Sequence, residues 1–329
     1  MVLSAKYFRQ ALIWLAVCIA LYGAAVLYEG WDEVSGSIAQ LGWSGWLAVL
    51  GLSLVNIVLR FIRWQYYLQR LGYHVPALLS FAYMLCGFAF TSTPAKAGEA
   101  VRSLYLKKHG VGYTRSLAAL FVERLTDLIA VVLLALMAAL VDPDLRWPVI
   151  VAGGALLLLL PLVHSAMLQR MLAWLATLFK AELVTKGVDA VLKLLRSASD
   201  LLKSGPLYGG MVLSMGAAFA VSLTMYVVLT ILGVEIPMYL AIGIYATGIL
   251  AGALSFLPGG IGSAELVMLG LLLIAGVDNA VALSAILICR VAGMWFPVAL
   301  GMLSIFIVEA FTSSAGEDGA TAEQGERHG

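Results

Sequence analysis

The sequence predicts an all-α protein that crosses a membrane several times, and three observations support this fold class. The chain of 329 residues is 62% hydrophobic and 12% charged, whereas a soluble domain has about 45–50% apolar and about 25% charged residues. Its apolar residues form runs close to the roughly 20 residues that a spanning helix needs. A pattern of charged residues and glycine occurs twice, 166 residues apart, which indicates an inverted repeat of two related halves.

Nine apolar runs mark the expected membrane segments in chain order: 11–28, 44–62, 77–92, 116–140, 147–165, 207–232, 239–257, 264–276 and 280–309. Runs 77–92 and 264–276 are too short to span a bilayer alone, and each adjoins a Pro/Gly break. We therefore expect about six spanning helices and two re-entrant helical hairpins, one containing 77–92 and the other formed by 239–276. Hydropathy alone would give about eight spanning segments.

The basic residues predict the orientation of these segments, because cytoplasmic loops collect Lys and Arg. Lys6 and Arg9 place the N-terminus in the cytoplasm. The basic residues that follow run 77–92 require the same side, so this hairpin enters from the cytoplasm. Segment 239–276 has no Lys or Arg, which fits entry from the outside. The last helix then returns, and both termini are expected in the cytoplasm.

The domain organisation is simple. We expect a single membrane domain over residues 1–311, followed by a Gly/Ala/Glu-rich disordered tail over 312–329. Residues 166–205 form the only sizeable polar stretch, and the spacing of its apolar residues predicts an amphipathic helix at the inner leaflet. This segment is either a basic connector or a specific lipid-binding segment.

The repeated pattern consists of a glutamate at a helix break, a glycine and an arginine. Glu99, Gly110 and Arg124 recur as Glu265, Gly276 and Arg290. Irregular backbone at membrane depth needs protein or a water-filled cavity to satisfy its polar groups. Proline and glycine permit such breaks, and the helix N-termini freed there would direct donors toward an anion. The residues that supply the breaks are Pro94, Gly98, Pro258, Gly259, Gly260 and Gly262.

Charged side chains inside a membrane are normally paired and face the protein interior. One interpretation is structural: Glu99 pairs with Arg124 and Glu265 pairs with Arg290, which leaves Asp127 over. The other is functional: these groups bind a lipid phosphate or exchange partners during transport, since the arginine fork suits phosphate.

Further arginines adjoin the repeated pattern. Arg102 follows Glu99 by three residues, on the same face of a helix, so it could pair with Glu99 or meet a phosphate. Arg60 and Arg63 end the second apolar run. They are expected to snorkel to the interface or, alternatively, to contact a headgroup at the cytoplasmic mouth.

No motif for enzyme catalysis is found. The chain has no Walker loop, Gly-x-Ser-x-Gly elbow, His-Glu-x-x-His or Asp-rich metal cluster. Its three cysteines have no metal-ligand spacing, and its net charge of +1 argues against nucleic acid as a partner. We expect neither an enzyme nor a cofactor or metal.

Several motifs resemble one known family. They are Arg60-x-x-Arg63-Trp64, Pro94-x-x-x-Gly98-Glu99-x-x-Arg102, Glu123-Arg124-x-x-Asp127, Pro258-Gly259-Gly260-Ile261-Gly262-x-x-Glu265, and Arg290 with Trp295. Together they resemble the flippase-like membrane domain of lysylphosphatidylglycerol synthases. The resemblance implies translocation of anionic or aminoacylated phospholipid, or of polyprenyl-linked intermediates, across a bacterial-type cytoplasmic (inner) membrane. The chain lacks the soluble aminoacyltransferase domain of the bifunctional synthases, so synthase activity is not expected.

Three hypotheses follow. The first is a lipid translocase that needs no ATP and binds the phosphate headgroup of a membrane lipid. The second is a membrane enzyme that modifies a lipid headgroup with a buried carboxylate as base. The third is a non-transporting partner of envelope-lipid glycosyltransferases or synthases. The translocase fits the repeated pattern and the resemblance best.

Overall fold

The computed structural model describes residues 31–91, 99–138, 182–255 and 257–308, with the isolated positions 16, 23, 147 and 151. Within these residues every regular element is a helix and none is a strand, so the all-α prediction is confirmed. The expected segments at 11–28 and 147–165 and the tail at 312–329 lie outside the described residues. The elements are α2 (Trp31–Arg70), α3 (Ala77–Phe88), α4 (Arg102–Lys107), α5 (Tyr113–Ala135), α8 (Glu182–Leu201), α9 (Ser204–Ile231), α10 (Met238–Leu254), η4 (Pro258–Gly260), α11 (Ser263–Ile274), α12 (Asn279–Arg290) and η5 (Val291–Trp295).

Three of the described helices are long and apolar enough to cross a bilayer: Ser35–Arg70, Gly205–Ile231 and Asn279–Val308. The last combines α12, the π-helical turn η5 and the residues up to Val308. Helix α5 has 23 residues, which corresponds to about 34 Å and is enough to cross a core about 30 Å thick. Its composition alone does not mark it as a spanning helix, because it carries several charged residues that belong to the candidate site described below.

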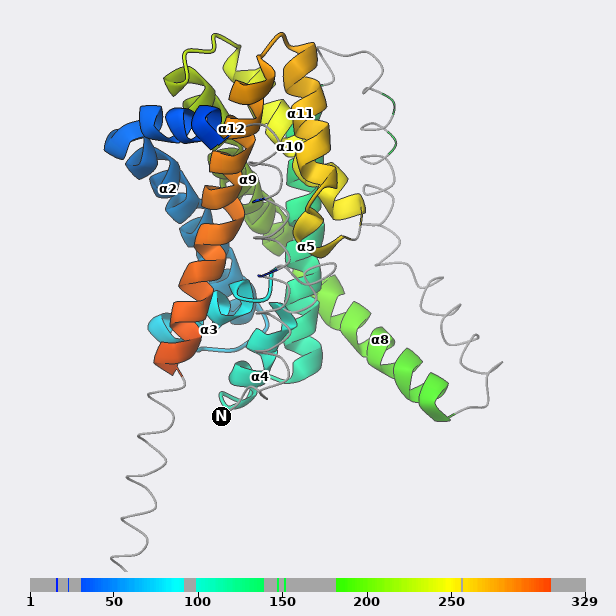
Figure 1. Ribbon diagram of the computed structural model, residues 1–329. Helices are drawn as coiled ribbons and strands as arrows, with labels where there is room; N and C mark the ends of the chain where they lie inside the picture. Colours follow the sequence, from blue (N-terminus) through cyan, green and yellow to red (C-terminus); the bar gives the residue numbers. More distant parts are fainter. Residues whose placement is uncertain are drawn as a thin grey trace, which may run out of the picture.

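Helix α2 is bent at Gly42, whose backbone has φ 59° and ψ 179°, a conformation that side-chain-bearing residues rarely adopt. After the bend, α2 packs along α9 (Figure 1). The Asn56 amide donates to the Ala217 carbonyl at 2.7 Å, and the Ser53 hydroxyl donates to the Ala292 carbonyl at 2.7 Å. Interhelical hydrogen bonds of this kind hold membrane helices together.

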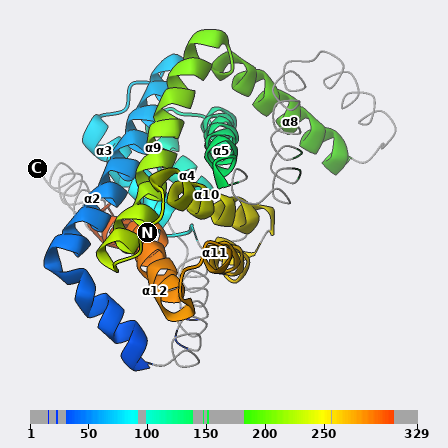
Figure 2. The ribbon, with the colours of Figure 1, turned by 90° about the horizontal axis from the view of Figure 1, so that it is seen from above.

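The short helices lie at opposite ends of the bundle. Figure 1 shows α3 and α4 toward the end where α2 finishes and α5 begins, whereas α10 and α11 lie toward the other end. Seen from above, α5 lies end-on among α4, α8, α9 and α10 (Figure 2). Helix α5 packs against α8, α9 and α10, and its Glu123 side chain is buried between elements.

The predicted break at Pro258–Gly262 is confirmed. It forms the short turn η4, and Gly259, Gly260 and Gly262 all have positive φ. A Cβ atom on Gly260 would come 2.7 Å from the Gly252 Cα of α10. Glycine is therefore required at position 260 for two reasons: the positive φ of the turn and the close approach of two backbones.

Helix α8 is the described part of the predicted amphipathic segment 166–205. Leu195, Ala198 and Leu201 are buried, and the helix packs against α5. Lys193 and Arg196 are exposed on the other side. The helical apolar face is therefore confirmed for the side chains that the structure describes.

Candidate functional site

Seven charged side chains converge where α2, the segment from Glu99 to α4, and α5 meet. We call this group the arginine–carboxylate cluster. Every member lies within 4.0 Å of an oppositely charged member. The members are Arg60, Arg63, Glu99, Arg102, Glu123, Arg124 and Asp127.

Glu123 is the centre of the enclosed part of this cluster. One of its carboxylate oxygens lies 3.4 Å from the Arg63 guanidinium, and the other accepts a hydrogen bond from Arg102. All three side chains are buried. Arg63 also donates to Asp127 and, at 2.5 Å, to the Ser214 hydroxyl of α9. A buried charge removed from its partners is strongly destabilising, so this part is built to stay closed.

Aromatic rings support two of the arginines. The guanidinium carbon of Arg102 lies 3.7 Å from the centre of the Trp64 ring, and that of Arg60 lies 4.7 Å from the centre of the Phe88 ring. A desolvated cation over an aromatic face gains about 2 kcal/mol or more. The rings therefore fix the positions of two guanidinium groups without neutralising their charge.

Arg60, Arg124 and Asp127 form the open part of the cluster, with side chains 15%, 27% and 26% exposed. Glu99 lies 3.3 Å from Arg124 and 3.6 Å from Arg60, and Asp127 lies 3.4 Å from Arg124 and 3.9 Å from Arg60. These distances exceed the roughly 2.7–2.9 Å of a tight charged hydrogen bond. Among the described residues, the Nε atoms of Arg60 and Arg124 have no hydrogen-bond partner. Arg60 and Arg124 are therefore loosely paired, whereas Asp127 also accepts a hydrogen bond from Arg63.

The charges of the described cluster do not cancel. Four guanidinium groups face three carboxylates, which leaves one formal positive charge in excess. Inside a low-dielectric region such a charge attracts an anion much more strongly than it would in water. The open part, with its unused guanidinium donors, is where an anion would meet it.

A second, smaller site lies at the other break. Arg290 Nε lies 2.6 Å from a Glu265 carboxylate oxygen, and Arg290 also donates to the Gly259 carbonyl at 2.8 Å. The N–H of Gly262 donates to Glu265 at 2.7 Å. This donor at the start of α11, expected to face an external anion, is thus used by the protein's own carboxylate. The pair is neutral, and the π-helical turn η5 follows Arg290 directly.

The structure brings most of the predicted site residues together. Glu99 contacts Arg124 and Glu265 contacts Arg290, as the structural interpretation expected. The helix-break residues Pro94 and Gly98 lie outside the described residues. Within the described segments, no three His, Cys, Asp or Glu side chains are arranged to hold a metal ion.

Three expectations were wrong in detail. Arg102 pairs with Glu123, an acceptor that was not considered for it. Asp127 is not left over, because it contacts three arginines. Arg60 and Arg63 do not snorkel: Arg63 is fully buried, and both lie in the cluster. Their partners on α5, on α9 and at Glu99 before α4 hold them inside the bundle.

Sequence reasoning missed Glu123 and Ser214 as members of the site. The spacing of Glu123 and Asp127 is a signal for Glu123, because residues four apart share one face of a helix, and Arg60 and Arg63 share a face in the same way. Nothing in the sequence near Ser214 links it to an arginine 151 residues away.

Comparison with known proteins places the whole site inside one family. Residues 12–301 match the family described as the lysylphosphatidylglycerol synthase TM region. The chain belongs to this family. The match contains both the arginine–carboxylate cluster and the Glu265–Arg290 pair, and it confirms the resemblance that the motifs indicated.

Two relatives have similar length. A UPF0104 membrane protein of Methanothermobacter thermautotrophicus is 28% identical over 314 residues, which cover 88% of this chain and 90% of the relative. Another, of Pyrococcus horikoshii, is 24% identical over 292 residues, which cover 78% of this chain and 84% of the relative. Together with the apolar helices, these findings make the protein a multi-pass membrane protein of this family.

Proposed function

We propose that the protein is a lipid translocase that moves an anionic or aminoacylated phospholipid, or a polyprenyl-linked lipid, across the cytoplasmic membrane. It acts as a transporter, without ATP hydrolysis and without a chemical step on the lipid. The observation that carries the proposal is the excess positive charge of the arginine–carboxylate cluster, combined with the loose pairing of Arg60 and Arg124 at its exposed side.

Phosphate is the anion that this arrangement suits. Arginine presents planar, paired donors that match phosphate oxygens, and Arg60 and Arg124 both contact Glu99 and Asp127. A headgroup phosphate would take over these guanidinium donors while Arg63 and Arg102 keep Glu123 in place. The lipid would therefore bind by exchange of partners in the open part of the cluster.

An apolar groove beside the cluster supports a lipid as the ligand. A groove of about 340 Å³ runs between α3 and the last turns after η5, lined by Leu78, Leu85, Leu303 and Ile307 among others. Phe88, which lies under Arg60, follows Leu85 by one helical turn. A ligand with an acyl chain in this groove and a phosphate at Arg60 would occupy both sites, as an amphiphile requires.

The two hairpins define the proposed orientation of the protein in the membrane. We propose that the α3–α4 hairpin enters from the cytoplasm and the α10–α11 hairpin from the other side, as an inverted repeat. Exposed Lys107 and Lys108 at the end of α4 fit a cytoplasmic face. Inverted repeats place broken helices near the membrane midplane, where substrate binds.

The termini would lie in the cytoplasm, and enzymes that make envelope lipids, such as glycosyltransferases or synthases, would be the natural partners.

A flipping assay on the protein reconstituted in liposomes tests this function. We expect Arg124→Gln to slow translocation of fluorescent phosphatidylglycerol by about tenfold or more, since a charged hydrogen bond contributes about 1.5–3 kcal/mol. The melting temperature should change little, because Arg124 is partly exposed and Glu99 and Asp127 both keep Arg60 as a partner. Lys108→Gln, an exposed cation of the same hairpin region, is the matched control and should flip lipid at the wild-type rate.

The same assay separates the remaining hypotheses. A wild-type flipping rate in folded Arg124→Gln protein would remove the cluster from the transport path. If Glu265→Gln also slows flipping, both halves of the repeat take part. Mass spectrometry of the liposome lipids should show no covalent change, and a modified headgroup would instead favour a membrane enzyme.

A further inference from the structure

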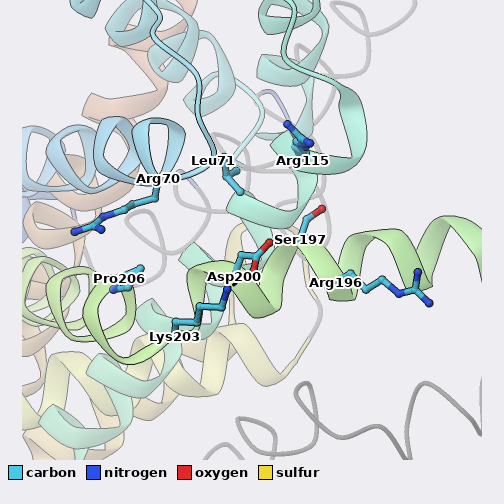
Figure 3. A pocket seen from close by; sticks show the side chains of 8 residues that line it. All are labelled: Arg70, Leu71, Arg115, Arg196, Ser197, Asp200, Lys203 and Pro206. Carbon is cyan, nitrogen blue, oxygen red and sulfur yellow. Dashed lines mark hydrogen bonds and ion pairs between the residues drawn. The ribbon is translucent and has the colours of Figure 1, made fainter.

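A second charged site lies at one end of the bundle, apart from the arginine–carboxylate cluster. A pocket of about 470 Å³ opens where the end of α2, the start of α5, α8 and the start of α9 meet (Figure 3). Arg70, Arg115, Arg196 and Lys203 line it, with Asp200 as its acidic residue. Arg70 follows Arg63 by seven residues on α2, a separation of about 10 Å along the helix axis. The pocket is therefore about two helical turns from the cluster, toward the proposed cytoplasmic side.

The pocket has a large excess of positive charge. Lys203 pairs with Asp200 at 2.7 Å. None of the three arginines pairs with a carboxylate in the part of the chain that the structure describes. The lining residues thus carry three positive charges in excess. A concave surface of one sign focuses its field and concentrates counter-ions.

Aromatic rings orient two of these arginines and leave their charge unneutralised. Arg115 donates to the Tyr73 hydroxyl at 2.9 Å, and its guanidinium carbon lies 5.5 Å from the centre of the same ring. The guanidinium carbon of Arg70 lies 5.0 Å from the centre of the Tyr66 ring. Arginines that are present only because cytoplasmic loops are rich in basic residues do not need contacts with aromatic rings. Arginines without acidic partners keep their charge available for an anion. Figure 3 shows Arg70 and Arg196 extending away from each other at the two sides of the pocket, so they would turn toward a bound anion.

The geometry points to a pocket that binds a phosphomonoester dianion presented from the cytoplasmic side. The start of α9 reaches the pocket at Pro206, and the positive end of a helix dipole favours an anion there. The volume lies within the range of about 300–1,000 Å³ that small-ligand sites occupy. A phosphomonoester carries up to two negative charges, which suits three excess cations better than a singly charged phosphodiester. Its source is either the headgroup of an inner-leaflet lipid or a soluble phosphorylated metabolite.

Binding to the full-length protein in phosphatidylcholine nanodiscs tests this site. Glycerol 3-phosphate, titrated by microscale thermophoresis, probes the soluble source. Phosphatidic acid, compared with phosphatidylcholine by native mass spectrometry, probes the lipid source. We expect at least one of the two to bind, and Arg70→Gln/Arg196→Gln to weaken that binding by about tenfold or more. Lys193→Gln removes an exposed charge from α8 outside the pocket and should leave the affinity unchanged.

Asp200→Asn provides a test in the opposite direction. Removal of the one acidic residue of the pocket frees Lys203, so the affinity should rise by about threefold or more, which misfolding could not produce. Absence of binding for both probes, or equal affinities for the wild type and Arg70→Gln/Arg196→Gln, would overturn the proposal. Binding of glycerol 3-phosphate involves no movement of lipid, so its result does not depend on whether the protein flips lipid.

Discussion

Glu123 is the residue on which the enclosed part of the site depends. It contacts Arg63 of α2 and Arg102 of α4 from its own position on α5, so one carboxylate joins three elements. The sequence drew attention to the charged residues of this site, because charged residues are few in so apolar a chain. It could not indicate the pairing, since spacing along one helix defines only neighbours on that helix. The pairing depends on how α2, α4 and α5 pack against one another.

Glu123→Gln should lower the stability of the protein strongly. Loss of one partner of a buried ion pair costs about 3–5 kcal/mol. Here Arg102 loses its carboxylate, while Arg63 keeps that of Asp127. Titration with denaturant in detergent micelles would measure the free energy of unfolding. Glu235→Gln, at an exposed position between α9 and α10, is the control and should be near neutral. Equal stability of Glu123→Gln and wild type would contradict the central role of Glu123.

The break between α10 and α11 shows how much of an element can be predicted. The Pro258–Gly262 stretch was expected to interrupt the helix, because its residue types leave few alternatives. The bend at Gly42 and the π-helical turn after Arg290 were not expected. The residues around both are compatible with continuous helix, and contacts with other helices decide the outcome.

At this break, Gly260→Ala and Gly270→Ala should behave differently. Gly260 has φ +66° and its Cβ would lie 2.7 Å from backbone of α10, so alanine should destabilise the protein by about 1–3 kcal/mol. Gly270 is helical, and nothing lies within 4 Å of its Cβ position. Alanine there should be neutral or slightly stabilising. Thermal unfolding of the two variants in the same detergent gives the comparison, and equal melting temperatures would argue against a tight turn at Gly260.

At the scale of the whole molecule, the distribution of charge predicted that the two halves differ in direction. The structure places α3–α4 and α10–α11 toward opposite ends of the bundle (Figure 1). Their entry into a membrane from opposite sides stays a prediction. The packing of α8 on α5 follows from an apolar face that the sequence displays. The angle at which α8 leaves the bundle does not follow from sequence, because it depends on the surface that α5 and its neighbours present.

Cysteine labelling would determine the orientation of the molecule. Lys108→Cys and Glu235→Cys, in a background without the native cysteines, place exposed thiols beyond α4 and between α9 and α10. In intact bacterial cells that express the protein, a membrane-impermeant maleimide should label Glu235→Cys. It should leave Lys108→Cys unlabelled until the membrane is permeabilised. Labelling of both from one side would rule out hairpins of opposite entry.

The contacts of Arg63 limit which parts of the molecule can move. Its guanidinium binds Glu123 and Asp127 of α5 and Ser214 of α9 while its backbone belongs to α2. Any motion that separates these three helices would strip a fully buried cation of its partners, at a cost of about 3–5 kcal/mol. We therefore expect helices α2, α5 and α9 to move as one rigid body. If the protein is a translocase as proposed, the cycle that exposes the cluster alternately to the two sides of the membrane would come from movement of the short helices α3–α4 and α10–α11 against that body.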